Sequence, residues 1–188
     1  KIHKGFNLKM YRGKDTSKTD DIIRGKDLRK FGYVDDRFNA EGSVIILQNI
    51  HNTEAGITGT RSSNGYVNET CSVIETENCD VAKYLLGILH SRVIAFYMYK
   101  YVYASSRIGM HLDTTYIHQI ILPEFDETIF SEIVKLVTDI EKTEYLSNDW
   151  FEILAEIDAY TYYAFDIDNE DVLYIENELQ KFRSRRWR

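Results

Sequence analysis

Proline and cysteine are both scarce in this sequence, and each scarcity excludes something. The 188 residues contain one proline, Pro123, and two cysteines, Cys71 and Cys79. Two cysteines without C-x-x-C spacing form neither a disulfide framework nor a convincing zinc site. We therefore expect both thiols to be reduced and structural.

Long apolar runs and targeting signals are also missing. No segment reads as a signal peptide. The longest apolar run, residues 80–103, is interrupted by Lys83, His90, Arg92 and Lys100, so it lacks the charge-free length of a membrane span. We expect no membrane partner and a cytoplasmic, prokaryotic location. Because the chain starts at Lys1, we also expect it to be a fragment of a longer polypeptide.

Recognisable catalytic motifs are absent. The sequence has no nucleotide-binding glycine-rich loop after a strand, no H-E-x-x-H and no G-x-S-x-G. The five histidines are scattered and lack carboxylates at ligand spacing. We therefore predict no catalytic residue, no metal site and no cofactor site in this chain. A small enzyme that uses clustered carboxylates stays open as an alternative.

Charge is distributed unevenly along the chain. Residues 1–110 contain 16 Lys and Arg against 12 Asp and Glu, whereas residues 111–188 contain 7 against 18. The net charge of −7 argues weakly against nucleic acid, but a local basic patch decides what a surface binds. The asymmetry indicates a basic functional half and an acidic half.

Apolar periodicity predicts one long central helix over residues 80–103, with Asp80 as its N-cap. Upstream, residues 43–50 predict a buried strand, and residues 57–60 and 66–74 predict two more. The Asn64-Gly65 pair predicts that residues 61–65 form a hairpin tip.

Downstream, residues 104–111 read as a loop and residues 116–122 as a strand that ends at Pro123. Three acidic helices follow. The first covers residues 126–143, the second is capped by Asn148 or Asp149, and the third is capped by Asp168 or Asn169. We predict a mixed α+β fold: a mostly antiparallel sheet around the central helix in residues 1–123, then an acidic helical region, 124–188.

Three segments have side chains that suit DNA. Residues 22–32 are rich in cations that neutralise phosphates, the predicted tip has groups that hydrogen-bond to base edges, and the loop after the central helix has small polar residues and an arginine. A solvated basic surface and an ordinary polar turn are the alternatives. The candidate DNA-binding residues are Arg24, Lys26, Arg29, Lys30, Arg61, Ser62, Asn64, Ser105, Ser106 and Arg107.

The order of the segments resembles the TaqI-like C-terminal specificity domain, and more distantly the recognition domains of type I restriction specificity subunits. Residues 23–31 (IRGKDLRKF) are similar to the family's R-G-(K/R)-D-I-(K/R)-R-Y segment. Residues 84–91 (YLLGILHS) are similar to its Y-L-L-G-I-L-N-S helix, and residues 117–123 (IHQIILP) to its L-P-(I/V)-P strand end. His90 stands where asparagine is usual, and the second proline is missing.

This resemblance implies a target-recognition domain for double-stranded DNA in a restriction–modification or phage-defence enzyme. The parent would be an adenine-specific DNA methyltransferase, with or without endonuclease activity, as in fused type II restriction enzymes. Its catalytic domain would use S-adenosylmethionine and flip the target base. With one proline, this chain lacks the Asn-Pro-Pro-Tyr motif of that domain, so a methyltransferase domain is an expected partner. The alternative is a protein–protein assembly module without DNA specificity of its own.

Overall fold

The computed structural model of the chain describes residues 2–3, 37–67, 71–107 and 109–182. A four-stranded sheet has the order β1-β4-β2-β5. Strand β1 (Ile2–His3) is parallel to β4 (Gly59–Val67), and β2 (Arg37–Gln48) is antiparallel to both β4 and β5 (Cys71–Glu75). A separate antiparallel ribbon pairs β3 (Ile50–Asn52) with β6 (Gly109–His111). Sheets and helices together confirm the α+β class.

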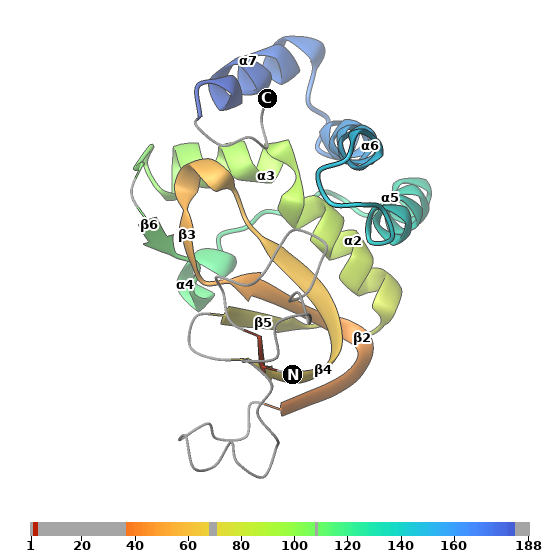
Figure 1. Cartoon of the computed structure of the whole chain (residues 1–188). Helices are drawn as coiled ribbons and strands as arrows, with labels where there is room; N and C mark the ends of the chain where they lie inside the picture. Colours follow the sequence, from red (N-terminus) through yellow and green to blue (C-terminus); the bar gives the residue numbers. More distant parts are fainter. Residues whose placement is uncertain (1, 4–36, 68–70, 108, 183–188) are drawn as a thin grey trace.

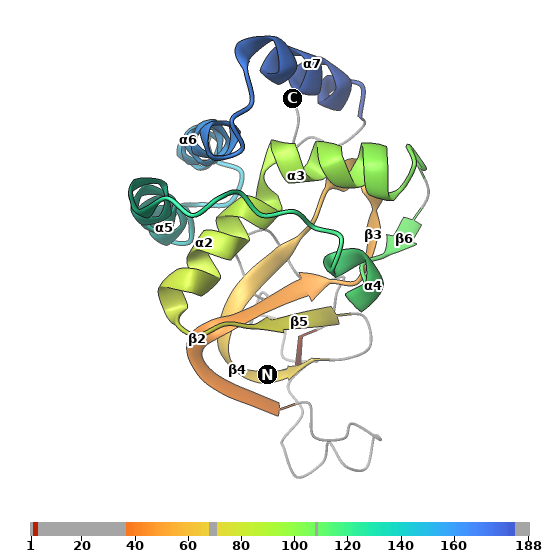
Figure 2. The ribbon, with the colours of Figure 1, turned by 180° about the vertical axis from the view of Figure 1, so that it is seen from behind.

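Helices cover one face of the sheet (Figures 1 and 2). Helix α2 (Cys79–His90) packs on β2 and β4, and α5 (Glu127–Ile140) packs against α2. Helix α6 (Asn148–Ala164) packs beside α5. Shorter elements complete the chain: the 3-10 turn η4 (Thr53–Ala55), α3 (Arg92–Tyr97), the π-helical turn η5 (Met98–Val102), α4 (Thr114–Ile117) and α7 (Asn169–Gln180).

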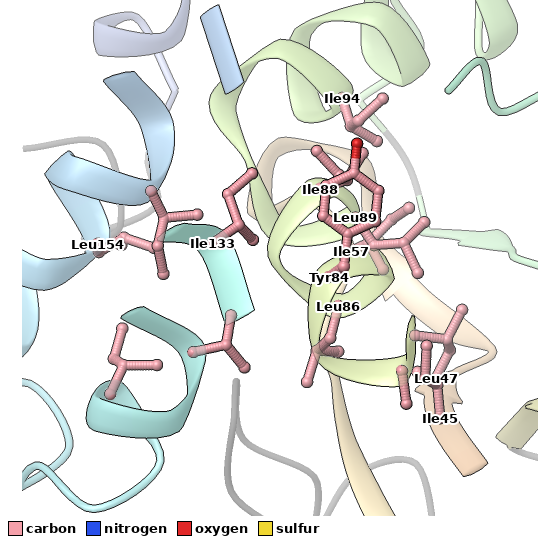
Figure 3. Packing of buried hydrophobic residues seen from close by; sticks show 14 of the residues in the cluster. Ile45, Leu47, Ile57, Tyr84, Leu86, Ile88, Leu89, Ile94, Ile133 and Leu154 are labelled. Atoms are coloured by element: carbon pink, nitrogen blue, oxygen red, sulfur yellow. The ribbon is translucent and has the colours of Figure 1, made fainter. Parts of the chain in front are cut away.

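The main core lies where α2 separates the sheet from α5 and α6 (Figure 3). Strand β2 places Ile45 and Leu47 in this core, whereas Val44 and Ile46 face the other side of the sheet, and all four are fully buried. This alternation follows the two-residue period of a strand. A strand buried on both faces reads as a continuous apolar run, as residues 44–47 do.

Helices α2 and α5 approach closely at Gly87. A Cβ atom built on Gly87 would lie 2.6 Å from Cγ2 of Ile133 and 3.2 Å from Cγ2 of Val137. The absence of a side chain on α2 therefore sets the distance between the two helices. This contact explains why a glycine follows the two leucines within α2.

The predicted helix over residues 80–103 is wrong as a single element. It starts at Cys79 with Asn78 as N-cap, breaks at Ser91, and bends there by 52°. The hydroxyl of Ser91 accepts a hydrogen bond from the backbone N–H of Ile94, and Asp158 accepts one from the backbone N–H of Arg92 at 2.8 Å. These acceptors cap a new helix, α3, inside the apolar stretch.

A partly buried ion-pair network at this break joins α6 and α7 to α3. The Nε of Arg92 lies 3.2 Å from a carboxylate oxygen of Asp158, and its Nη1 pairs with Glu176. The hydroxyl of Tyr162 donates to the same Glu176 at 2.8 Å, and its pKa is raised by burial and by this hydrogen bond. Three helices that are distant in sequence thus meet at one guanidinium.

The downstream predictions had mixed outcomes. The three acidic helices are confirmed as α5, α6 and α7, although Ser147 is the N-cap of α6. The strand predicted over residues 116–122 is wrong: Asp113 caps the helical turn α4, and the chain from His118 to Pro123 has no strand. A short strand, β6, instead lies in the predicted loop 104–111.

In the described part of the chain, no single helix is long and apolar enough to cross a membrane, although α2 and Arg92–Val102 together meet that criterion by length and composition. We predicted a division of the chain at residue 123. Residues from both sides of this position contribute to the main core.

Candidate nucleic-acid interface

The loop of residues 104–107 follows η5 and leads toward β6. Ala104 and Ser105 adopt the left-handed conformation, with φ of 48° and 60°. The backbone N–H of Ser105 donates to the carbonyl of Tyr99 at 2.8 Å, and the hydroxyl of Thr53 donates to the carbonyl of Ser106 at 2.5 Å. Left-handed backbone at non-glycine residues persists only where surrounding contacts hold it, as they do here. The loop is therefore fixed from both η5 and η4.

Arg107 is the charged group that this loop presents. Its Nε donates to the hydroxyl of Tyr99 at 3.3 Å and lies 3.5 Å from a carboxylate oxygen of Glu54. The side chain of Glu54 is 7% exposed, whereas that of Arg107 is 58% exposed. The hydrogen bond with Tyr99 and the charge of Glu54 both raise the pKa of Arg107. A buried carboxylate thus orients an exposed, permanently charged guanidinium.

Aromatic rings pack together at the start of this loop. The rings of His51 and Tyr103 have centroids 5.7 Å apart, and those of Tyr103 and Tyr116 are 5.2 Å apart. Burial lowers the pKa of His51 and raises that of Tyr103. In the described structure, His51 Nδ1 and the Tyr103 hydroxyl are buried without a hydrogen-bond partner. Burial is the larger influence on the pKa of His51, and a hydrogen bond with the backbone of Asn49 opposes it only in part, so the imidazole is neutral at pH 7.

We expect His51 to make stability pH-dependent. Its folded pKa lies below the unfolded value of about 6.5, so below that pH the unfolded chain binds more protons than the folded chain. The free energy of unfolding should fall as pH decreases below about 6.5, by at most about 1.4 kcal/mol per pH unit from this group. Urea unfolding from pH 7.5 to 5.5 measures it.

The matched variants are His51→Gln and His118→Gln, because His118 is exposed. The first should flatten the pH dependence between 7.5 and 5.5, and the second should leave it unchanged. Equal slopes for wild type and His51→Gln would contradict the assignment.

The predicted hairpin tip at residues 61–65 is wrong. These residues lie inside β4, where Arg61 pairs with Ile45 and Ser62 pairs with Val44 of β2. The connection to β5 lies between Val67 and Cys71, and residues 68–70 fall outside the described part of the chain. Asn-Gly tolerates the tight turn of a hairpin but does not require one, and here Asn64 and Gly65 continue the pairing opposite Asn39 and Phe38 of β2.

Arg61 makes a two-pronged contact with α5. Its Nε and Nη2 donate to the two carboxylate oxygens of Glu141 at 2.8 and 2.6 Å, and its Nη1 lies 3.0 Å from Sγ of Cys79. Burial by itself would lower the pKa of Arg61, but the hydrogen bond and charge of Glu141 outweigh it, so the pKa is raised. In this structure Arg61 joins the sheet to α5.

The predicted contact residues therefore do not form one cluster. The loop with Ser105, Ser106 and Arg107 packs beside η4, whereas Arg61 contacts α5; Figures 1 and 2 show α5 and β6 on opposite sides of α2. Asn64 lies in β4 opposite Asn39 of β2. The cations of residues 22–32 (Arg24, Lys26, Arg29 and Lys30) lie outside the described residues, so their role stays a prediction.

Two important residues of this site, Glu54 and Tyr99, were missed from the sequence. Glu54 lies in a predicted turn, where a carboxylate normally faces solvent, and Tyr99 lies among many tyrosines of an apolar stretch. Neither has a local sequence signal. Glu54 contacts Arg107 across 53 residues of sequence, and nothing distinguishes Tyr99 from the other tyrosines of its segment. Among the described residues, no three or more His, Cys, Asp and Glu side chains are placed to hold a metal ion.

Comparison with known proteins adds no family assignment. No protein-family model matches the chain, and no curated protein matches it either. The resemblance to a specificity domain therefore rests on the sequence motifs alone.

Proposed function

We propose that this chain is a sequence-specific recognition module for double-stranded DNA. The observation that supports the proposal is Arg107, which the buried carboxylate of Glu54 and the hydroxyl of Tyr99 hold on the exposed side of a fixed loop. A donor whose direction is set before binding favours base readout, since an ordered side chain loses less entropy on association. The sheet and helices then serve as the scaffold of this loop.

The chemistry favours guanine as the contacted base. The contacts of Arg107 with Tyr99 and Glu54 both use its Nε, and within the described residues the structure shows no hydrogen bond from either Nη. An arginine bonds O6 and N7 of guanine through two donors in the major groove. The hydroxyls of Ser105 and Ser106 lie beside it in sequence and can bond either base edges or phosphates.

We also propose that the chain serves an adenine-specific DNA methyltransferase, with or without endonuclease activity. The motifs quoted above are similar to those of adenine-specific methyltransferases and fused restriction enzymes, in which a separate domain binds S-adenosylmethionine. In that setting, Arg24, Lys26, Arg29 and Lys30 would supply phosphate contacts. Phosphate contacts give affinity and strong salt dependence, whereas base contacts give discrimination.

Arg107→Ala tests the proposal. The purified chain is mixed with a random pool of duplex DNA at two salt concentrations, and the retained DNA is sequenced. We expect one short site to be enriched by wild type and to persist at the higher salt. Arg107→Ala should lose preference at one G·C pair by roughly ten- to a hundredfold, the usual range for a two-donor contact.

Matched variants separate charge from readout. Lys135→Ala removes an exposed cation of α5, and α5 and β6, the strand after the Arg107 loop, lie on opposite sides of α2. This substitution should leave the enriched site unchanged. Glu54→Gln should weaken the same G·C preference without changing the salt dependence. Enrichment of the same site by wild type and Arg107→Ala would contradict the assignment of Arg107, and no enrichment by wild type would contradict DNA readout.

An assembly role is the second candidate function, and a specific observation favours it. Three large apolar side chains are exposed on η5 and α7, namely Tyr101, Leu173 and Tyr174, and such exposure is typical of surfaces that contact another protein.

A further inference from the structure

Apolar side chains of α3, η5 and α7 form one surface, here called the apolar ridge: the half-buried Tyr97 and the exposed Tyr101, Leu173 and Tyr174. Tyr101, Leu173 and Tyr174 are 69%, 65% and 48% exposed. The buried ring of Phe96 lies between them, with centroids 6.2 Å from Tyr101 and 5.8 Å from Tyr174. Tyr97 extends the ridge, 5.9 Å from Tyr101.

Carboxylates flank the ridge on α7. Glu170 and Asp171 are exposed and precede Leu173 and Tyr174 by three residues each. Residues three apart on a helix lie on the same face, so each exposed apolar group has a carboxylate one turn away. The nearby Lys100 forms an ion pair with Glu178 at 3.4 Å.

The wider surface has the same sign of charge. Residues 143–180, which include α6 and α7, contain eleven Asp and Glu and no Lys, Arg or His. Only some of these carboxylates serve the fold: Asp158 and Glu176 bind Arg92, and Glu178 binds Lys100 and Lys181. Of the exposed carboxylates, Glu170 and Asp171 share the face of α7 that presents Leu173 and Tyr174, whereas Lys100, which interacts with Tyr174, is already paired with Glu178, so this side of the ridge is anionic.

This charge selects among possible occupants. Nucleic acid and anionic lipid would be repelled by the exposed carboxylates. A second copy of the chain, paired through the same face, would place like charges opposite each other. A cationic partner with its own apolar stripe satisfies both features.

We propose that the apolar ridge is a docking surface for a basic amphipathic helix of a partner protein. Leucine-sized side chains of the partner would cover Tyr101, Leu173 and Tyr174, and its lysines and arginines would face Glu170 and Asp171. Helices that bind this way use apolar residues three and four apart, the spacing that α7 itself presents. None of the ridge residues contacts Arg107 or holds its loop among the contacts described above, so the proposal goes beyond DNA recognition.

The test uses a labelled 18-residue peptide of leucine and lysine arranged with helical periodicity, and fluorescence anisotropy measures its binding to the whole chain. Two control peptides are a scrambled sequence of equal composition and a version with glutamate in place of lysine. We expect wild type to bind the amphipathic basic peptide at least tenfold more tightly than either control, and less tightly at higher salt.

Variants locate the binding. Tyr101→Ser combined with Leu173→Ser and Tyr174→Ser should weaken binding at least tenfold, and Glu170→Gln with Asp171→Asn should weaken it severalfold and reduce its salt dependence. Tyr163→Ser, at a residue of α6 that is 75% exposed, should bind like wild type. Circular dichroism checks folding, and the carboxylate variant gives a separate answer if the triple variant unfolds.

Three results would overturn the proposal. The first is equal binding by wild type and the carboxylate variant. The second is equal or tighter binding of a control peptide. The third is a dimer of the chain in sedimentation velocity that the triple variant abolishes, which would identify a second copy as the occupant.

Discussion

Asp158→Ala should lower the free energy of unfolding by about 3 kcal/mol, because it removes one partner of a buried ion pair. The Asp158 side chain is 6% exposed and accepts hydrogen bonds from both the backbone N–H and the Nε of Arg92. Its loss leaves Glu176 as the remaining carboxylate of the network on Arg92 and removes one of the two acceptors that cap α3, the other being the hydroxyl of Ser91. Urea unfolding followed by far-ultraviolet circular dichroism measures the change.

Two comparisons make this result specific. Asp158→Asn keeps an acceptor for the backbone N–H of Arg92 but loses the charge, so its effect should be intermediate. Glu156→Ala removes an exposed carboxylate from the same helix and should change stability by no more than about 0.5 kcal/mol. A loss below about 1 kcal/mol for Asp158→Ala would mean that the network does not hold α3, α6 and α7 together.

Gly87→Leu should destabilise the fold by about 3 kcal/mol, near the upper end of the usual cost of overpacking a core. Its Cβ alone would lie 2.6 Å from Ile133, a residue that is fully buried. Since neither α2 nor α5 has free space at this contact, the helices must separate to admit the new side chain. The same unfolding experiment measures the effect.

Gly87→Ala and Ala155→Leu are the controls for this prediction. Alanine gains helix propensity but still crowds Ile133, so it should cost less than leucine. Ala155 is exposed on α6, and leucine there adds the same side chain without a neighbour to displace. An unchanged stability for Gly87→Leu would show that α5 can move away from α2 at no cost.

The sequence predicted those elements whose signals are local. Strand β2 follows from the run of β-branched residues at 44–46, and α5 and α7 follow from an apolar face that begins after Asp126 and Asp168. In each, propensity, cap and burial agree, so no distant residue is needed to decide the structure.

Elements that depend on a distant partner were mispredicted. At the break after Ser91, the first N–H of α3, that of Arg92, donates to Asp158, which is 66 residues away from Arg92. Helical periodicity continues across the break, because residues on both sides are buried. Periodicity alone therefore predicts one helix where the structure has two.

The candidate site shows the same limit. Ser105, Ser106 and Arg107 were identified from their residue types, but Glu54 and Tyr99, which orient Arg107, were not. Arg61 was identified as a base contact because arginine and asparagine read bases, yet its guanidinium binds Glu141, which is 80 residues away. Residue type suggests the chemistry of a side chain, and only the fold determines its partner.

Helix α7 has a consequence for how the molecule opens. It belongs to a second apolar cluster (Val93, Ala95, Phe96, Tyr99, Tyr162, Ile175, Leu179 and Phe182) that is separate from the main core of α2. Segments with their own small core exchange amide hydrogens through partial opening rather than global unfolding. The amides of α7 should therefore exchange before those of α2, and Asp158→Ala should widen this difference, so that one charge pair sets the order in which the fold comes apart.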